Sequence, residues 1–320
     1  MPTFKITLAY DGSCFTGWQL QPGQRTVQGV LEVVLRQLTG QSVRVRGASR
    51  TDTGVHALGQ VAAFTLDARF TAEELLRAMN ALLPADVAIL QIEEASAGFR
   101  PSRDAAAKRY RYLIYDGPIR HIFLRRYAWQ MDYRLDAWAM HQAGQRLVGT
   151  HDFASFQSRG SPRLDTIRTL FDVSVRRCGA GQRGSPRWTP LQDPVLLCSL
   201  GCPVPSVETS GRASVPEQKS LDFGDFVVPQ GRAGQGGDLV VVEVEGNGFL
   251  YHMVRAIVGT LVEVGRGKRP PEWLAEVLAA RNRSAAGKTA PPEGLYLLYV
   301  RFDPPSGFSP ERSQSWQSER

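Results

Sequence analysis

The segment RGASRTDTGVHALGQVAAF, from Arg46 to Phe64, places one carboxylate, Asp52, on a turn between two strand-like stretches. The stretches around that turn, Ser42–Arg46 and Gln60–Leu66, contain the β-branched and apolar residues that favour strands. Gly54 permits the tight backbone geometry that such a turn requires. The pattern predicts a strand, a short turn and a second strand, and the purpose of the lone acid remains to be explained.

Around this segment, the first hundred residues alternate between strand-like and helix-like stretches. We expect strands at Phe4–Tyr10 and Val87–Ile92, a helix at Val27–Leu38 with Thr26 as its N-cap, and a second helix from the capping box Thr71–Glu74 to Leu82. The resulting order is β-α-β-β-α-β, which is the split βαβ pattern of ferredoxin-like folds and RNA-recognition modules. Residues 1–104 are therefore expected to form one ferredoxin-like half that carries the Asp52 turn.

Residues 105–303 repeat this pattern loosely and are expected to form a second half. The expected elements are a strand in Ala105–Gly117, a helix at Asp136–Leu147, strands at Ile167–Val175 and Leu239–Val244, helices at Phe249–Val264 and Pro271–Ala280, and a last strand at Gly294–Phe302. Between them, residues 176–237 are rich in Gly, Pro and Ser and predict a loop insertion, and the polar residues 304–320 predict a disordered tail. The fold class is α+β, with a cleft between two halves as the expected place for a site.

The composition favours a nucleic-acid partner. The net charge is +7, and 38 Lys and Arg residues include only five lysines, which leaves 33 arginines. Arginine binds phosphate bidentately and stacks on bases, although codon bias in a GC-rich genome would also replace Lys with Arg. Neither a signal peptide nor a run of about 20 apolar residues is apparent, so we expect a cytoplasmic protein without a membrane segment.

Several motifs that would indicate a cofactor or a metal fail on their context. The G-x-G-x-x-G match at residues 179–184 is followed by Pro186 and Pro190, so no helix opens there to bind a dinucleotide. Cys198 and Cys202 have no second pair of ligands with zinc spacing. The His151-Asp152 pair is more typical of a loop or cap than of a metal ligand. The sequence therefore predicts neither a cofactor nor a metal.

Asp52 has an ordinary explanation, an Asx-turn, and a catalytic one. Arg50 lies two residues away, and a neighbouring cation keeps a carboxylate ionised and nucleophilic. Tyr110 stands among basic residues, which is an arrangement suited to base stacking. Arg255 falls within the apolar run FLYHMVRAIVG, where a buried cation would need a carboxylate partner such as Asp52. These features favour the catalytic explanation.

The sequence resembles the TruA family of tRNA pseudouridine synthases over nearly its whole length. The matching segments are YDGSCFTGWQLQP (10–22), TVQGVLE (26–32), SRTDTGVHALGQVAAF (49–64), NALLPADV (80–87), KRYRYLIYDG (108–117), THDFASFQS (150–158), TIRTL (166–170), GNGFLYHMVRAIVGTLVEVG (246–265) and APPEGLYLLYV (290–300). The resemblance implies two ferredoxin-like halves with joined, mostly antiparallel sheets, a central catalytic cleft and a homodimer. It also implies an isomerase, an intramolecular transferase, that works without cofactor or metal.

The resemblance further implies a role for each residue at the predicted site. Asp52 matches the catalytic aspartate, Arg50 an arginine associated with flipping the target uridine, and Tyr110 the tyrosine that stacks on the base. Arg255 matches the arginine that pairs with the aspartate. The implied substrate is uridine at positions 38, 39 and 40 in the anticodon arm of tRNA. Whether Asp52 would act as nucleophile or as base stays open.

Other basic residues are candidate RNA contacts on charge alone, and solvated surface is the alternative for each. The candidates are Arg44, Arg46, Lys108, Arg109 and Arg111. An RNA-binding module of the same fold that has lost activity is the alternative function. The presence of all four residues matched to the family's site argues against such a loss.

Overall fold

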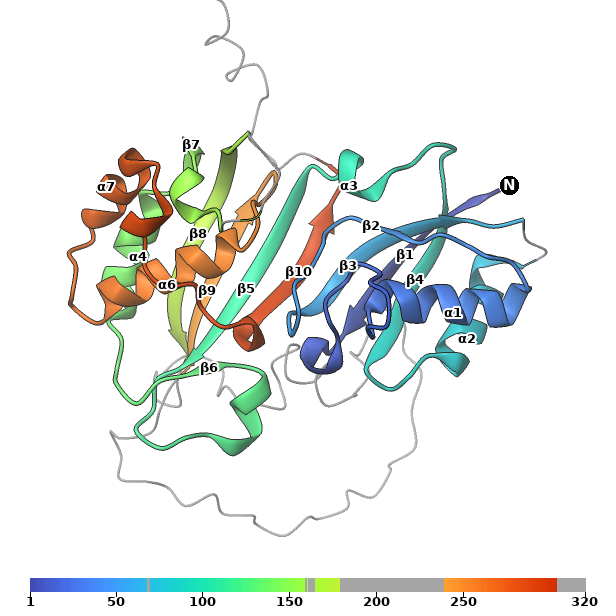
Figure 1. Cartoon of the computed structure of the whole chain (residues 1–320), viewed down its shortest axis with the longest axis horizontal. Helices are drawn as coiled ribbons and strands as arrows, with labels where there is room; N and C mark the ends of the chain where they lie inside the picture. The colour runs from blue at the N-terminus through green and yellow to red at the C-terminus, as the bar shows by residue number, and fades with distance from the viewer. Residues whose placement is uncertain (68–69, 159, 161–164, 179–238, 304–320) are drawn as a thin grey trace, which may run out of the picture.

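The computed structural model describes residues 1–67, 70–158, 160, 165–178 and 239–303. Within these residues, one sheet of ten strands runs through the molecule in the order β4-β1-β3-β10-β5-β9-β8-β7, with β2 paired to β3 and β6 paired to β5 (Figure 1). All pairings are antiparallel except β10 with β3 and β5 with β6. The predicted α+β class with joined, mostly antiparallel sheets is confirmed.

The N-terminal strands and helices follow the predicted order. They are β1 (Thr3–Tyr10), α1 (Val27–Thr39), β2 (Arg46–Gly47), β3 (His56–Thr65), α2 (Ala72–Leu82) and β4 (Val87–Ala95). The short 3-10 helix η1 (Gly12–Cys14) lies between β1 and α1. The strand order β4-β1-β3-β2 is that of a ferredoxin-like unit. Thr26 caps α1 through Gly29, and Thr71 forms the predicted capping box with Glu74.

The C-terminal strands repeat this arrangement, because β10-β5-β9-β8 has the same relative order as β4-β1-β3-β2. The main elements are β5 (Ala107–Tyr115), α4 (Ala137–Gln145), β8 (Ile167–Cys178), β9 (Leu239–Gly246), α6 (Met253–Gly265), α7 (Trp273–Ala280) and β10 (Leu295–Arg301). Shorter elements are α3 (Pro101–Asp104), η2 (Ile122–Arg126), β6 (Trp129–Gln130), β7 (Gly149–Asp152), η3 (Ala154–Phe156), η4 (Arg283–Ala285) and η5 (Pro292–Gly294).

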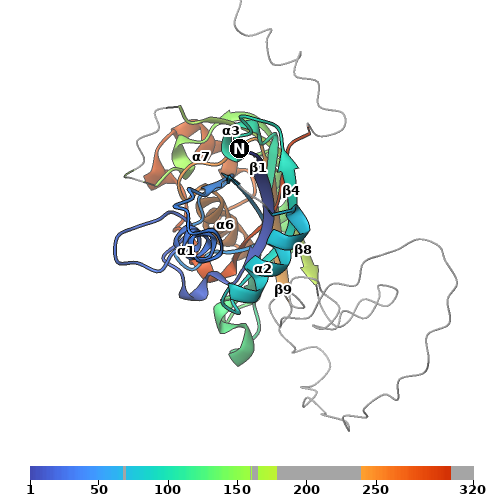
Figure 2. The same ribbon diagram turned by 90° about the vertical axis from the view of Figure 1, so that its right-hand side faces the viewer.

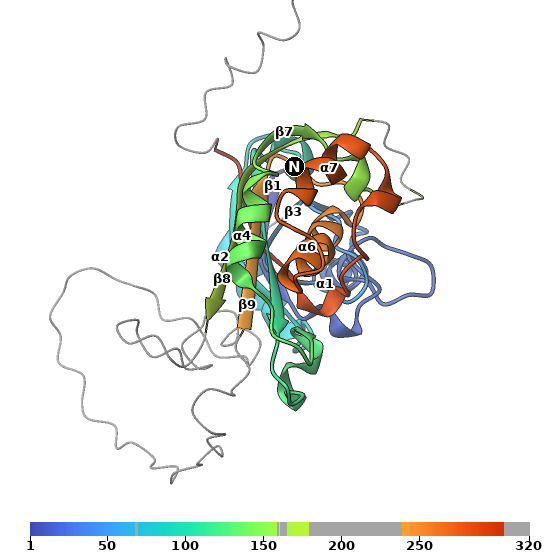
Figure 3. The same ribbon diagram turned by 90° about the vertical axis from the view of Figure 1, so that its left-hand side faces the viewer.

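One face of the sheet carries the main core. Side chains of α1, α2, α4 and α6 belong to the same hydrophobic cluster as alternate residues of β5 and β9, including Tyr110, Tyr112 and Val242. Figures 2 and 3 show α1, α6 and α7 together on one side of the sheet. This arrangement places the first turns of α6 over the centre of the sheet, beside the loop that carries Asp52.

The opposite face carries charge where β5, β9 and β8 lie side by side. Arg109 binds Glu243, Glu245 and Asp172, and Arg111 binds Glu243. Because successive side chains of a strand point to opposite faces, these arginines point away from the Tyr110 side of β5. The carboxylates are nearly buried, with 7% of the Glu243 and Glu245 side chains exposed, so each needs a cation beside it.

Three predicted boundaries near the site are wrong. The strand expected at Ser42–Arg46 is only Arg46–Gly47. The backbone N–H of Val45 donates to the Glu32 carboxylate on α1, so it does not pair with a neighbouring strand. Strand β3 starts at His56, four residues before the predicted start, since its first residues pair with β10. Helix α6 starts at Met253 and not at Phe249.

The predicted insertion also begins too early. Arg176, Arg177 and Cys178 continue β8 and pair with Val241, Val240 and Leu239 of β9. The remainder of the insertion, the rejected glycine motif, the Cys198–Cys202 pair and the predicted tail all lie outside the described residues.

Candidate active site

The side-chain amide of one buried residue, Gln60, fixes the backbone of the loop between β2 and β3. Gln60 on β3 is fully buried, and its Nε2 donates to the Ser49 carbonyl at 2.7 Å. Its Oε1 accepts from the backbone N–H of Ser49 at 3.2 Å. Both backbone groups of Ser49, three residues before Asp52, are therefore satisfied by one side chain.

The turn that presents Asp52 is equally well held. The Asp52 carbonyl accepts from Val55 N at 3.2 Å, and Gly54 between them has a φ of 78°, a conformation that glycine adopts without strain. Thr51 is buried, and its Oγ1 lies 2.8 Å from the hydroxyl of Tyr10 on β1. The predicted tight turn is present, and it fixes the backbone beneath the carboxylate.

The Asp52 carboxylate faces α6. Its Oδ2 accepts from Arg255 Nη1 at 3.4 Å, and 26% of the Asp52 side chain is exposed. Arg255 is held in turn, because its Nε donates to the Ala290 carbonyl at 2.7 Å. The structure thus brings together the two residues that the sequence analysis paired, and the contact joins a loop of the first half to a helix of the second.

Sequence reasoning missed His252, which also contacts Asp52. Its Nε2 lies 3.4 Å from Asp52 Oδ2, the same oxygen that faces Arg255. Burial lowers the pKa of His252, nearby Arg255 and Arg283 lower it further, and Asp52 raises it; the net direction is below the ordinary value. Spacing alone did not give this contact, because His252 lies just before α6 in a left-handed conformation and not on the helix.

Tyr110 lies next to the Asp52 loop on the core face of β5. Its hydroxyl is 2.7 Å from Ser49 Oγ, and its ring meets Phe249 edge-on at 5.1 Å between centroids. Burial, together with the Asp52 charge, raises the pKa of Tyr110 to about 12 although the Ser49 hydrogen bond lowers it. The phenol is therefore protonated at neutral pH. Only 6% of the residue is exposed, so stacking a base on it requires neighbouring side chains to move.

Arg50 and His56 flank Asp52 but do not contact its carboxylate in the way that Arg255 does. Arg50 is exposed on the same loop. His56 is buried, its Nδ1 accepts from Gly12 N at 3.1 Å, and its Nε2 faces the carbonyls of Arg126 and Glu293. His56 therefore joins the start of β3 to distant backbone and holds the fold around the loop.

The five RNA-contact candidates separate into two groups. Arg44 and Arg46 are exposed on the segment that leads to Asp52, and Lys108 donates to the Ala48 carbonyl at 2.7 Å. Arg109 and Arg111 lie on the far face of the sheet, in ion pairs with Glu243 and other acids. The structure therefore brings three of the candidates to the side of the Asp52 loop and two to the other side.

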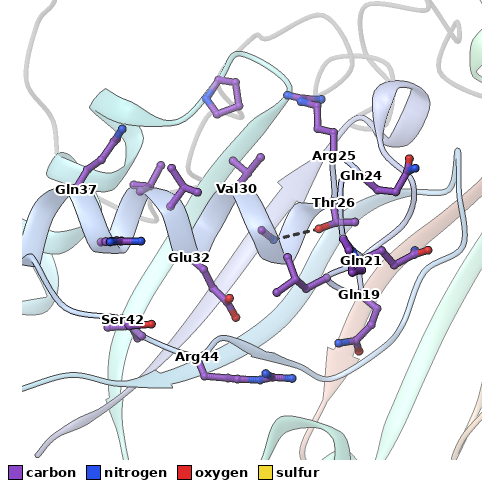
Figure 4. A pocket seen from close by; sticks show the side chains of 18 of the residues that line it. Gln19, Gln21, Gln24, Arg25, Thr26, Val30, Glu32, Gln37, Ser42 and Arg44 are labelled. Carbon is purple, nitrogen blue, oxygen red and sulfur yellow. Dashed lines mark hydrogen bonds between the residues drawn. The ribbon is translucent and has the colours of Figure 1, made fainter.

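Arg44 also borders a groove of about 1010 Å³ beside α1. The groove is lined by α1, by the segment 19–26 and by the segment 42–44, with Arg25, Arg36 and Arg44 as its cations (Figure 4). Asp52 is not among its lining residues, so the groove is a surface separate from the Asp52 loop. The acidic residue that lines this groove is Glu32, whose carboxylate accepts hydrogen bonds from the Gln28 side chain and from the backbone N–H of Val45.

The described residues offer no group of three or more His, Cys, Asp and Glu side chains that could hold a metal ion. Across the same residues, none of the helices combines the length and the apolar character needed to cross a membrane.

Comparison with known proteins matches residues 6–99 and 143–303 to the model of a family described as tRNA pseudouridine synthase. The chain belongs to this family. It is 35% identical to a tRNA pseudouridine synthase A from Thermoanaerobacter sp. (strain X514) over 302 residues, which cover 94% of this chain and 100% of the relative. Identities are 37% to the protein of the same name from Lacticaseibacillus casei (strain BL23) and 38% to that from Brevibacillus brevis, again over 94% of this chain and all of each relative.

The two matched blocks cover both sides of the contact at Asp52. The first matched block contains the Asp52 turn and Tyr10, and the second contains α6 with Arg255 and His252. Asp52, Arg255 and His252 therefore fall within the family match, whereas Tyr110 lies between the two matched blocks.

Proposed function

We propose that the protein is a tRNA pseudouridine synthase, an isomerase that converts uridine to pseudouridine in the anticodon arm, at positions 38, 39 and 40. The observation that carries this proposal is the Asp52 carboxylate, which is presented on a fixed turn against Arg255 and beside the buried Tyr110. The family match and the net charge of +7 support an RNA substrate.

The reaction needs few groups from the protein. The N1–C1′ bond of the uridine breaks, the uracil turns in place, C5 bonds to C1′, the C5 proton leaves, and N1 is protonated. Because the target nucleotide is stacked within a stem, it must first be extruded into a pocket. Substrate and product are isomers, so the reaction requires neither an oxidant nor a second substrate.

Asp52 is proposed as the essential carboxylate, either as the nucleophile at C1′ or as the base that starts cleavage of the glycosidic bond. The guanidinium of Arg255 is proposed to orient the carboxylate in either role, since it lies 3.4 Å from Oδ2. Tyr110 is proposed to support the detached uracil with its ring, and exposed Arg50 to take part in extruding the nucleotide.

We further propose that the protein acts on tRNA in the cytoplasm and assembles as a homodimer. The resemblance of the whole chain to the TruA family supports the dimer. Trp138 on α4 also supports it, because 67% of this large apolar residue is exposed, and interfaces are enriched in such residues. Light scattering during gel filtration would test the assembly, and a monomeric mass at micromolar concentration would refute it.

The activity is tested by release of tritium from tRNA labelled at uridine C5, with the wild type compared with Asp52→Asn. The exchange keeps the shape and removes the charge. Asp136→Asn is the matched control, because Asp136 is an exposed N-cap of α4. Release by the wild type and the control but not by Asp52→Asn, with tRNA binding retained in all three, is expected. Binding without release by the wild type would favour the inactive RNA-binding module.

A further inference from the structure

His252 stands in a backbone conformation that costs free energy. Its φ and ψ of 60° and 10° place it in the left-handed region, immediately before α6. For a residue other than glycine this conformation costs roughly 1–2 kcal/mol. The only other non-glycine residue with positive φ in the described part of the chain is Arg281, at a helix end. The conformation directs the imidazole of His252 to the Asp52 side of the helix.

The ring of His252 is held on three sides. Its Nδ1 lies 3.1 Å from Ser158 Oγ, and the backbone N–H of Ser158 donates to the carbonyl of Tyr251 at 3.1 Å. The ring of Tyr251 stacks on the imidazole at 3.7 Å between centroids. The third side meets Asp52 through Nε2. When the Ser158 hydroxyl donates to Nδ1, the neutral ring carries its proton on Nε2, which then points at the carboxylate.

The two partners of Asp52 share one of its oxygens. Arg255 Nη1 and His252 Nε2 both lie 3.4 Å from Oδ2. Both partners of Asp52 thus approach the same carboxylate oxygen, Oδ2. Distances of 3.4 Å exceed an ideal hydrogen bond, and catalytic hydrogen bonds commonly shorten when substrate binds.

We propose that neutral His252 positions Asp52 for the reaction by donating Nε2–H to Oδ2, and that protonation of His252 switches this arrangement off. The inference rests on the proposed function and adds a positioning residue and a pH control to it. Protonated His252 would place a second full positive charge beside Oδ2. Asp52 would then be held more tightly as an ion pair and would be a weaker nucleophile and a weaker base.

The charges around His252 set the direction of this pH dependence. The groups that face it are Asp52 on the loop before β3, Arg255 on α6 and Arg283 on η4. Burial and the two arginines favour the neutral ring and outweigh Asp52, so the pKa of His252 lies below its ordinary value of about 6.5. His252 is thus neutral at pH 7 and above, and activity falls as the pH decreases through its pKa.

The test compares His252→Gln with His252→Leu in the tritium-release assay from pH 5 to pH 9. Gln keeps a donor near the position of Nε2 but does not titrate, whereas Leu keeps the size and removes the donor. At pH 8 we expect His252→Gln to retain kcat within about threefold, and His252→Leu to lose on the order of tenfold or more. The decline at acid pH should move to lower pH in His252→Gln, because the imidazolium can no longer form.

A merely structural role would lower the melting temperature or the affinity for tRNA and leave the pH profile of kcat unchanged. Equal losses in the two variants, or wild-type kcat in His252→Leu, would also overturn the proposal. His141→Gln is the matched control, because His141 on α4 is a part-exposed histidine whose Nδ1 accepts from Val175 N. It should leave the acid limb unchanged.

A second measurement does not depend on activity. Proton NMR would follow the imidazole of His252, assigned from the signal lost in His252→Gln, in the wild type and in Asp52→Asn. Removing the carboxylate that favours the imidazolium should lower the pKa of His252 further. An unchanged pKa would refute the contact even if the wild type released no tritium, so failure of this inference is distinguishable from failure of the proposed function.

Discussion

Gln60 provides the sharpest test of whether the proposed activity requires a fixed backbone in the Asp52 loop. Gln60→Leu keeps the volume but removes the hydrogen bonds to Ser49 N and Ser49 O. An unsatisfied backbone group costs about 1–3 kcal/mol, and Ser49 is partly accessible to water, so we expect a total loss of about 2 kcal/mol. For a domain of this size, that loss lowers the melting temperature by roughly 4–8 °C.

The effect of Gln60→Leu on activity should exceed its effect on stability. Ser49 precedes Asp52 by three residues, and its hydroxyl also lies 2.7 Å from the hydroxyl of Tyr110. A displacement of about 1 Å at a reacting group can cost on the order of 100-fold in rate. We expect kcat for tritium release at 25 °C, well below the unfolding transition, to fall by roughly 10- to 100-fold, while the affinity for tRNA changes little.

Asn80→Leu is the matched control for this prediction. Asn80 on α2 makes the same pair of bonds to one backbone residue, donating to Ile89 O at 2.9 Å and accepting from Ile89 N at 2.8 Å. Ile89 lies on the edge strand β4, so this pair tests stability without touching the loop. A lower melting temperature with wild-type kcat in Gln60→Leu would refute the reasoning. The loop would then be fixed by other contacts, such as that of Thr51 with Tyr10.

Two further predictions concern surface charge and acid stability. Arg44→Glu should weaken tRNA binding and reduce its salt dependence, which filter binding at several salt concentrations would measure. Arg109→Gln should leave tRNA binding unchanged but lower the free energy of unfolding by up to about 3 kcal/mol, because Glu243 loses one cation. Filter binding and chemical denaturation would check these two effects. Asp11→Asn should destabilise the protein by about 1–2 kcal/mol at pH 7, because Asp11 accepts from Tyr127 at 2.8 Å. Burial raises the pKa of Asp11, but its hydrogen bonds hold it well below its usual range, so the stability that they confer is present above about pH 4 and is lost as the pH falls. Equal acid denaturation curves for Asp11→Asn and the wild type would contradict this, as would a loss of tRNA affinity in Arg109→Gln.

Local patterns in the sequence predicted the elements well where the deciding contacts are local. The Thr71–Glu74 capping box and the Thr26 cap are made within one helical turn, and both are present. The wrong boundaries depend on contacts that are distant in sequence. Val45 leaves the sheet because of Glu32 on another element, and β3 begins early because His56 pairs with Tyr296 of β10. No periodicity in either segment contains that information.

The same distinction holds for charge. Lys108, Arg109 and Arg111 form one basic run, and alternation along a strand predicts that they divide between the two faces of a sheet. What the run does not predict is the presence of Glu243, Glu245 and Asp172 beneath two of these side chains. A basic residue on a strand can therefore be proposed as a phosphate contact only when the face of the sheet on which it lies, and the acids on that face, are known.

The site itself depends on how the two halves join. Parallel pairing of Tyr296 with His56 ties the start of β3 to the last strand of the chain, directly after the turn that carries Asp52. Arg255 and Ala290 also exchange bonds in both directions, which ties α6 to the segment that leads into β10. Asp52 and Arg255 thus meet because both are anchored to the neighbourhood of β10. A substitution that loosens β10 from β3 should separate the pair without altering either residue, so we expect the proposed activity to depend on this junction as well as on the carboxylate.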